Sequence, residues 1–169
     1  MRAADPEAGV IERAICNDDI RSLQLPNSPV TVSTEATLQE VVEVLQDQHI
    51  GCVLVVDPAG KLAGIFTERD LLTRVAGKRL DWSQERVTGY MTADPETLRL
   101  DDRIAWALNF MHLGGYRHVP LTDEEHRPVG VVSVKDIISF LVELFPAPVL
   151  NLPPDPHRKP GDQAASGEG

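Results

Sequence analysis

The chain has 169 residues, of which 42% are hydrophobic and 25% charged, and this composition suits one globular domain or two small units that share a core. A formal net charge of −10 argues against nucleic acid as the main partner, because that binding relies on Lys and Arg side chains to neutralise phosphates. Two cysteines outside any metal-ligand spacing, and no apolar run near the roughly 18 residues of a membrane span, predict a cytoplasmic protein with neither a disulfide scaffold nor a membrane partner.

The first half of the chain predicts a strand, a helix, two strands and a second helix, after an N-terminal stretch with only a short helical pattern. Thr37 and Glu40 form a capping box before a helix that Gly51 is expected to end. A second helix begins at Thr67, and its apolar residues are expected to face inward. The expected strands are 30–32, 52–56 and 62–66, and the inward residues of the second helix are Leu71, Leu72 and Val75.

The same order of elements returns in the second half of the chain. Asp101 or Asp102 is expected to cap a helix, and Gly114 and Gly115 to end it. A last helix begins at Ser133 and again carries an apolar stripe. The expected strands are 97–98, 117–121 and 129–132, and the inward residues of the last helix are Ile137, Ile138, Leu141 and Leu144.

The two halves are copies of one another at an offset of 66 residues. Residues 64–72 and 130–138 both read Gly, two apolar residues, Thr or Ser, any residue, a basic residue, Asp and two apolar residues. Self-similarity at a fixed period indicates a duplicated structural unit. A β-α-β-β-α unit of this length is marginal alone, so we expect two of them to pack as a pseudo-two-fold pair with a cleft on either side. The predicted fold is therefore α+β.

The pattern divides the chain into five parts. Because proline and glycine are concentrated after the last helix, the C-terminal tail is expected to be extended or disordered. The parts are an N-terminal segment 1–20, a first repeat 21–76, a linker 77–88, a second repeat 89–146 and a tail 147–169.

With this duplicated motif, the chain resembles the cystathionine β-synthase (CBS) domain pair, or Bateman module, in a stand-alone form. The resemblance covers about residues 20–145 and rests most on 64–70 and 130–136. It implies a binding module and no enzyme, with no catalytic cofactor or metal. It also implies adenosine-containing ligands in the clefts between the repeats: AMP, ADP or ATP, with S-adenosylmethionine or NAD as further candidates. Such pairs commonly form homodimers and regulate a partner protein, which the sequence does not identify.

The motif of the second repeat suggests a nucleotide site by its chemistry. Asp136 lies three residues into a helix, where its oxygens suit the hydroxyls of a ribose, and Ser133 adds a hydroxyl at the helix start, where free N–H groups suit a phosphate. Ser133 and Asp136 also fit a capping box that needs no ligand. The resemblance makes Arg117 and His118 candidates for phosphate contacts, which Lys135 would join. The alternative is surface charge and a strand-edge histidine, but three basic groups that converge on one cleft favour the phosphate role.

The resemblance adds residues from the facing strands and predicts a weaker site in the first repeat. Thr31 would make a polar contact and Ala36 would form a wall of the adenine pocket in the second-repeat cleft. In the first repeat, Gly51 and Cys52 stand at the positions of Arg117 and His118 and carry no charge, so that cleft is expected to be weaker, empty or suited to a less anionic compound. The first-repeat cleft would be formed by Thr67, Arg69, Asp70, Thr97, Gly51 and Cys52.

Three functions remain open at this point. The favoured one is a regulatory sensor of adenine nucleotides. The alternative is a ligand-free dimeric adaptor, which the acidic composition and the proline-rich tail favour. A small hydrolase or transferase ranks last, because the sequence shows no nucleophile with a paired base. Trp106 and Phe110 lie off the inner stripe of their helix and would form an apolar outer face suited to a dimer.

Overall fold

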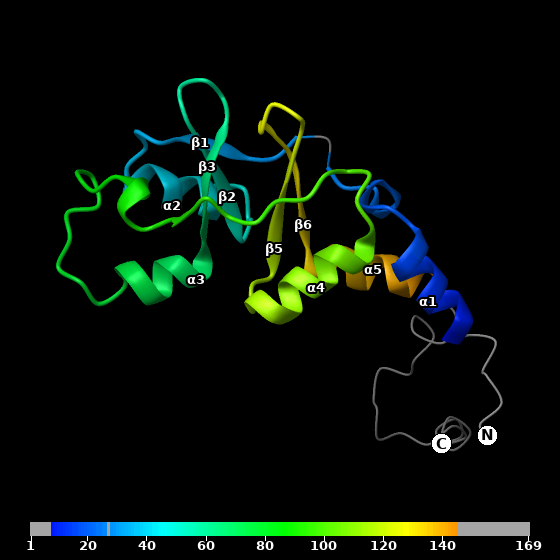
Figure 1. Ribbon diagram of the computed structural model, residues 1–169. Coiled ribbons are helices and arrows are strands. Elements are labelled where there is room, and N and C mark those ends of the chain that lie inside the picture. The colour runs from blue at the N-terminus through cyan, green and yellow to red at the C-terminus, as the bar shows by residue number, and fades with distance from the viewer. Residues whose placement is uncertain (1–7, 27, 145–169) are drawn as a thin grey trace, which may run out of the picture.

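The computed structural model describes residues 8–26 and 28–144, and the tail predicted at 147–169 lies outside this part of the chain. Two units of β-α-β-β-α order lie side by side, as Figure 1 shows, and the predicted α+β fold with two tandem repeats is confirmed. No helix in these described ranges is long and apolar enough to cross a membrane. The elements are α1 (Ala8–Asn17), η1 (Ile20–Leu23), β1 (Thr31–Ser33), α2 (Leu38–Asp47), β2 (Cys52–Val56), β3 (Leu62–Thr67), α3 (Glu68–Asp70), η2 (Leu71–Val75), η3 (Val87–Gly89), β4 (Thr92–Ala93), α4 (Ile104–Gly114), β5 (His118–Thr122), β6 (Pro128–Ser133) and α5 (Val134–Leu144).

The two sheets share one plan but differ in size. In the first repeat the strand order is β1-β2-β3-β4, with β1 parallel to β2 and the other pairs antiparallel. In the second repeat β5 and β6 form an antiparallel pair, and Leu98 makes a single parallel bridge to Leu121 that corresponds to the β1–β2 pairing. β4 comes from the residues that open the predicted second repeat (89–146), yet it pairs with β3 of the first repeat, and this strand was not predicted. Gly64 lets it approach, since a Cβ at Gly64 would lie 2.8 Å from the carbonyl oxygen of Thr92.

Each repeat completes the core of the other with the segment that precedes it. Ile20, ahead of the first repeat, is fully buried in the core of the second, and its N–H donates to Asp102 O at 2.8 Å. Val87, ahead of the second repeat, is fully buried in the core of the first, and its N–H donates to Ala36 O at 2.9 Å. The periodicity of the sequence gives no sign of this exchange, because a single apolar residue in an irregular segment carries no period.

A third apolar cluster joins the repeats. Leu54, Leu62 and Ile65 of the first sheet are buried there, with Cys52 and Val131 packed against them. The N–H of Leu62 also donates to the carbonyl of His126 at 2.9 Å, so main-chain contact crosses the same boundary. The two sheets therefore face each other, and the clefts open at the edges of this cluster.

The predicted helix ends are partly right. The capping box at Thr37 is present, with the Glu40 N–H donating to Thr37 Oγ1 at 3.3 Å and the Thr37 N–H to Glu40 Oε2 at 2.8 Å. The backbone turns left-handed at His49, not Gly51, after α2. Neither predicted aspartate caps α4: the N-cap residue is Arg103, and Asp102 Oδ2 accepts from the Arg99 N–H instead.

Two apolar residues predicted to face inward are exposed. Leu72 is 71% exposed and Ile138 54%, and they are equivalent residues of the two repeats. Ile137 and Val75 are buried as predicted. A helical stripe identifies the apolar face but not how far the sheet extends to cover it, so the residue at its margin remains uncovered.

Candidate functional site

The predicted junction motif has the same geometry in both repeats. In the second, the N–H and the Oγ of Ser133 donate to Asp136 Oδ2 at 2.8 and 2.6 Å, and the Asp136 N–H donates to Ser133 Oγ at 3.3 Å. In the first, Thr67 and Asp70 make the same three bonds. The capping interpretation therefore holds at both sites and uses one carboxylate oxygen, Oδ2. What each aspartate can bind depends on its other oxygen, Oδ1.

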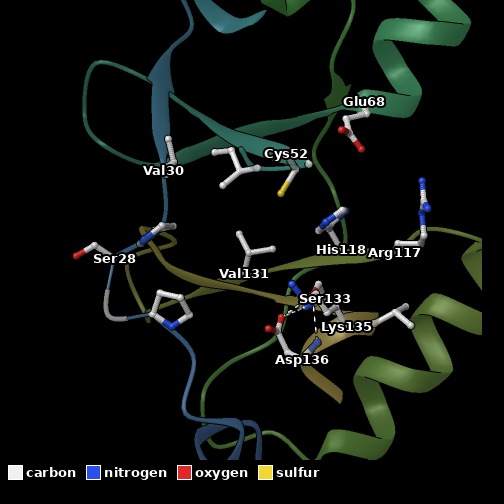
Figure 2. A pocket seen from close by; sticks show the side chains of 15 residues that line it. Ser28, Val30, Cys52, Glu68, Arg117, His118, Val131, Ser133, Lys135 and Asp136 are labelled. Atoms are coloured by element: carbon white, nitrogen blue, oxygen red, sulfur yellow. Dashed lines mark hydrogen bonds between the residues drawn. The ribbon is translucent and has the colours of Figure 1, made fainter. Parts of the chain in front are cut away.

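The second-repeat cleft, formed between the two sheets, has a volume of about 500 Å³. Figure 2 shows Val30 and Cys52 on the first-repeat side and Val131 on the opposite side, with Ser133 and Asp136 at one end. The walls are mostly apolar, so a flat apolar ring system fits between them while its polar substituents reach the ends. The lining residues are Pro26, Ser28, Pro29, Val30, Ile50, Gly51, Cys52, Glu68, Arg117, His118, Val131, Ser133, Val134, Lys135 and Asp136.

Asp136 keeps one oxygen available to a ligand. Its side chain is half-buried, and within residues 8–26 and 28–144 no hydrogen bond or ion pair is made to Oδ1. Main-chain donors at this helix start are fewer than the sequence suggested. The Val134 N–H donates to Arg117 O at 3.1 Å and the Asp136 N–H to Ser133 Oγ, so a phosphate here would depend mainly on side chains.

His118 and Cys52 face the cleft in their neutral forms. Burial lowers the pKa of His118, the Arg117 charge lowers it further, and the carboxylates of Asp136 and Glu68 partly oppose these effects, so the imidazole is neutral at pH 7. Burial, with the same two carboxylates, raises the pKa of Cys52 to about 12. The thiol therefore stays protonated and acts as an apolar wall rather than a nucleophile.

The two clefts meet at a shared boundary. Gly51, Glu68, Arg117 and His118 line both of them. Arg117 is exposed, and Figure 2 shows its side chain extending away from Asp136. The positive charge of Arg117 is thus shared between the clefts, whereas the sequence had suggested that it belongs to the second alone.

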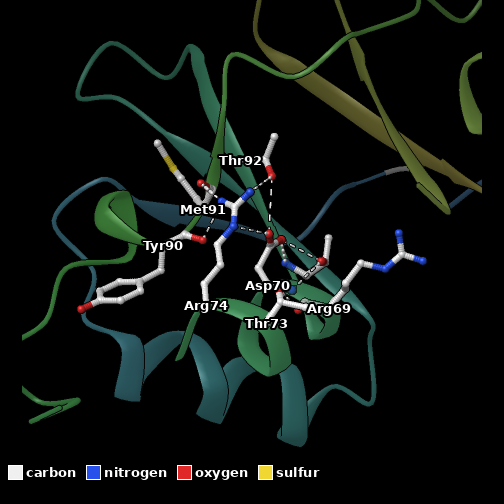
Figure 3. A network of polar contacts seen from close by, with 8 residues as sticks. Arg69, Asp70, Thr73, Arg74, Tyr90, Met91 and Thr92 are labelled. Atoms are coloured by element: carbon white, nitrogen blue, oxygen red, sulfur yellow. Dashed lines mark hydrogen bonds and ion pairs between the residues drawn. The ribbon is translucent and has the colours of Figure 1, made fainter. Parts of the chain in front are cut away.

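The first-repeat cleft is smaller, about 300 Å³, and its aspartate is already engaged. Asp70 is only 7% exposed, and its Oδ1 lies 3.3 Å from Arg74 Nε and accepts from Thr92 Oγ1 at 3.5 Å. Figure 3 shows Arg74 between Asp70 and the chain at 90–92, where it also donates to the carbonyls of Tyr90 (3.0 Å) and Met91.

The structure brings most, but not all, of the predicted residues together. Thr67, Arg69 and Asp70 line the first cleft, and Gly51 lines both, whereas Cys52 lines only the second. Three predicted residues line neither cleft: Thr31 is exposed on the edge strand β1, Ala36 lines a separate depression beside α2, and Thr97 lies in a polar pocket with Asp101 and Asp123.

The residues that sequence reasoning missed come mainly from loops and from the apolar walls. Glu68 occupies the unspecified position of the first motif and lies at the boundary of both clefts. Prolines indicate a turn but not its direction, so nothing in the sequence showed that Pro26, Ser28 and Pro29 line the second cleft. The missed lining residues of that cleft are Pro26, Ser28, Pro29, Val30, Ile50, Glu68, Val131 and Val134.

Comparison with known proteins shows one recurring similarity. A family profile described as "CBS domain" matches residues 20–77 and 87–143. A CBS domain-containing protein of Arabidopsis thaliana is 36% identical over 120 residues, which is 71% of this chain but only 21% of that protein, so the chain spans about a fifth of the length of this relative.

Two solved structures show the same arrangement over nearly their whole length. A CBS-domain containing protein from Agrobacterium tumefaciens has a TM-score of 0.67 and 29% identity, with 73% of this chain and 99% of that one covered. A CBS domain protein from Pyrobaculum aerophilum, complexed with AMP, has a TM-score of 0.67 and 26% identity, with 75% and 98% covered.

Proposed function

Because this chain belongs to the CBS domain family, we propose that it is a regulatory module that binds an adenine nucleotide of the AMP, ADP or ATP class in the second-repeat cleft and signals its occupancy to a partner protein. The observation that carries the proposal is the free Oδ1 of Asp136, at the end of a mostly apolar cleft of about 500 Å³. A carboxylate oxygen in that position accepts hydrogen bonds from ribose hydroxyls, while the adenine ring packs between the apolar walls. The AMP complex of the Pyrobaculum protein supports the same ligand class.

In this proposal, different side chains of the second-repeat cleft contact the adenine ring, the ribose and the phosphate. Val30, Cys52 and Val131 contact the adenine ring, and Asp136 binds the ribose. Lys135 is exposed beside Asp136, and together with His118 it faces the phosphate. None of these groups forms a nucleophile with a paired base, so the proposed role is regulatory binding without catalysis. S-adenosylmethionine and NAD remain alternative ligands for the same cleft.

Thermal unfolding with AMP, ADP, ATP, S-adenosylmethionine and NAD tests this proposal. A ligand present at 100 times its dissociation constant stabilises the folded chain by about 2.7 kcal/mol, which produces a clear rise in Tm. A rise with at least one adenine nucleotide is expected. If none of the five compounds raises Tm, the chain is better explained as a ligand-free dimeric adaptor.

The carboxylate of Glu68 is expected to select against long phosphate chains. Glu68 lines the cleft at its boundary with the first-repeat cleft, and Figure 2 shows its carboxylate near Cys52. Each added phosphate brings negative charge towards the Glu68 carboxylate. Like charges in a cleft open to water repel by an amount on the order of 1 kcal/mol, and this repulsion opposes the binding of a longer phosphate chain. We expect Glu68→Gln to tighten ATP binding by about threefold to tenfold and AMP binding by less.

Isothermal titration of both nucleotides on the wild type and the variant measures this effect. Glu43→Gln, on the exposed face of α2, removes the same charge far from the clefts and serves as the matched control. An equal gain for AMP and ATP would contradict the role of Glu68 in selecting phosphate number.

The proposal includes a cytoplasmic homodimer. The helices α3, α4 and α5 lie on one side of the sheets, as Figure 1 shows, and large exposed apolar side chains lie on α4, α5 and η2. A second copy of the chain would cover such a face.

We expect Ile138→Asp to shift the protein from dimer to monomer in sedimentation velocity, with Ile11→Asp on α1 as the control. A wild type that sediments as a monomer would contradict the dimer. The exposed residues are Leu72, Trp106, Leu113 and Ile138.

A further inference from the structure

Arg74 occupies the position in the first-repeat cleft where a ligand would meet Asp70. Its guanidinium pairs with Asp70 Oδ1 at 3.3 Å and donates to Tyr90 O at 3.0 Å and to Thr92 Oγ1 at 3.2 Å, as drawn in Figure 3. Asp70 Oδ2 is taken by Thr67, and Thr92 Oγ1 donates to Oδ1 as well. Both oxygens of this carboxylate therefore have partners from the chain itself.

The equivalent residues of the second repeat cannot make these contacts. Arg74 corresponds to Phe140, which packs against the apolar core of its repeat, and Thr92 corresponds to Pro26, which has no donor group. Phe140 and Pro26 therefore offer no hydrogen-bond donor to Oδ1 of Asp136, whereas Arg74 and Thr92 both donate to Oδ1 of Asp70. This explains in local terms why Oδ1 of Asp136 is free while that of Asp70 is not.

The two clefts also differ in the polarity of their walls, and the first cleft is the more polar. Val30 and Ile50, which line the second cleft, correspond at the 66-residue offset to Glu96 and Tyr116. Tyr116 lines the first cleft, where its hydroxyl donates to Glu96 Oε2, so a hydrogen-bonded tyrosine stands where the second cleft has the apolar Ile50. A flat apolar ring therefore has less matching surface in the first cleft.

Resting on the proposed function, we propose that Arg74 is the residue that closes the first-repeat cleft to nucleosides, so that each chain holds one adenine nucleotide, in the second cleft. A ribose in the first cleft must displace a charge-assisted contact that is also held by two main-chain carbonyls and Thr92. The close approach of β4 at Gly64 keeps these acceptors in place, because main chain and Met91 fill the space beside that glycine. Arg74 thus acts as an internal substitute for a ligand.

Binding stoichiometry measured by equilibrium dialysis with AMP tests the inference. We expect one AMP per chain for the wild type and for Asp70→Asn, and two for Arg74→Phe, which introduces the side chain of the second repeat. The double variant Arg74→Phe, Asp136→Ala is expected to bind one. Arg79→Phe makes the same substitution at an exposed position outside both clefts and is expected to bind one.

Each outcome discriminates between the two proposals. Two AMP molecules on the wild type, with one lost in Asp70→Asn, would overturn the closure while leaving the nucleotide function intact. A wild type that binds no AMP, but whose Arg74→Phe variant binds one, would retain the closure and reject the second-cleft function. If Arg74→Phe does not fold, Arg74→Gln replaces it, and a folded variant without an added site would overturn the inference.

Discussion

Replacing Asp136 with alanine is expected to weaken adenine nucleotide binding by at least about a hundredfold. Hydrogen bonds to a charged group contribute roughly 1.5–3 kcal/mol each, and a ribose offers two hydroxyls to the free Oδ1, so about 3 kcal/mol of binding free energy is at stake. The loss should appear in isothermal titration as an undetectable or millimolar affinity. It should also remove the ligand-dependent rise in Tm.

The same substitution also removes a helix cap, and this effect must be separated from binding. Losing the bonds between Ser133 and Asp136 destabilises the fold by about 1 kcal/mol. Glu40→Ala breaks the equivalent reciprocal pair with Thr37 at the start of α2, away from both clefts, and is the matched control. We expect Glu40→Ala to cost similar stability and to leave nucleotide affinity unchanged. Equal affinities for Asp136→Ala and the wild type would exclude Asp136 as the ribose contact.

Truncating Ile20 is expected to lower the free energy of unfolding by about 3 kcal/mol, a large share of the total for a domain of this size. Ile20 lies outside the duplicated pattern, yet it is fully buried in the core of the second repeat. Ile20→Ala leaves a cavity that its neighbours cannot easily fill, since the segment is also fixed by main-chain bonds to Leu100 and Asp102. Urea denaturation followed by circular dichroism measures the change.

Ile11→Ala provides the control for this substitution. Ile11 is 38% exposed on α1, so its truncation should change stability by no more than about 0.5 kcal/mol. Because Ile20 and Val87 each complete the core of the other repeat, both Ile20→Ala and the wild type should unfold in one transition. Two separate transitions, or equal stability losses at the two isoleucines, would contradict the exchange of segments between the cores.

Much of the fold was predictable from the sequence because its signals are local. The alternation of strands and helices, the capping box at Thr37 and the two junction motifs all depend on residues within four positions of each other. The exchange of Ile20 and Val87 was not predictable, because it depends on contacts between segments about 80 residues apart in one case and about 50 in the other.

The part of the candidate site that lies at one helix start was predictable from the sequence, whereas the walls of the cleft were not. Ser133, Lys135 and Asp136 lie together in the cleft because one short helix start carries all three. Thr31, Ala36 and Thr97 were placed by resemblance, and all three lie outside both clefts: Thr31 is exposed on β1, Ala36 lines a depression beside α2 and Thr97 lines a polar pocket. The walls come from strands of both repeats, whose facing surfaces cannot be read from either strand alone.

By itself, the sequence determined the duplicated α+β repeat and the paired Ser/Thr–Asp junctions, since short-range hydrogen bonds and apolar periodicity are encoded in neighbouring residues. Only the tertiary structure decided that the two junctions are unequal. The spacing of Arg74 and Asp70 allows a helical ion pair, but Arg74 is held there by the carbonyls of Tyr90 and Met91, which β4 brings alongside. The physical reason is that whether a carboxylate oxygen is free depends on every donor within reach, and those donors arrive from distant parts of the chain.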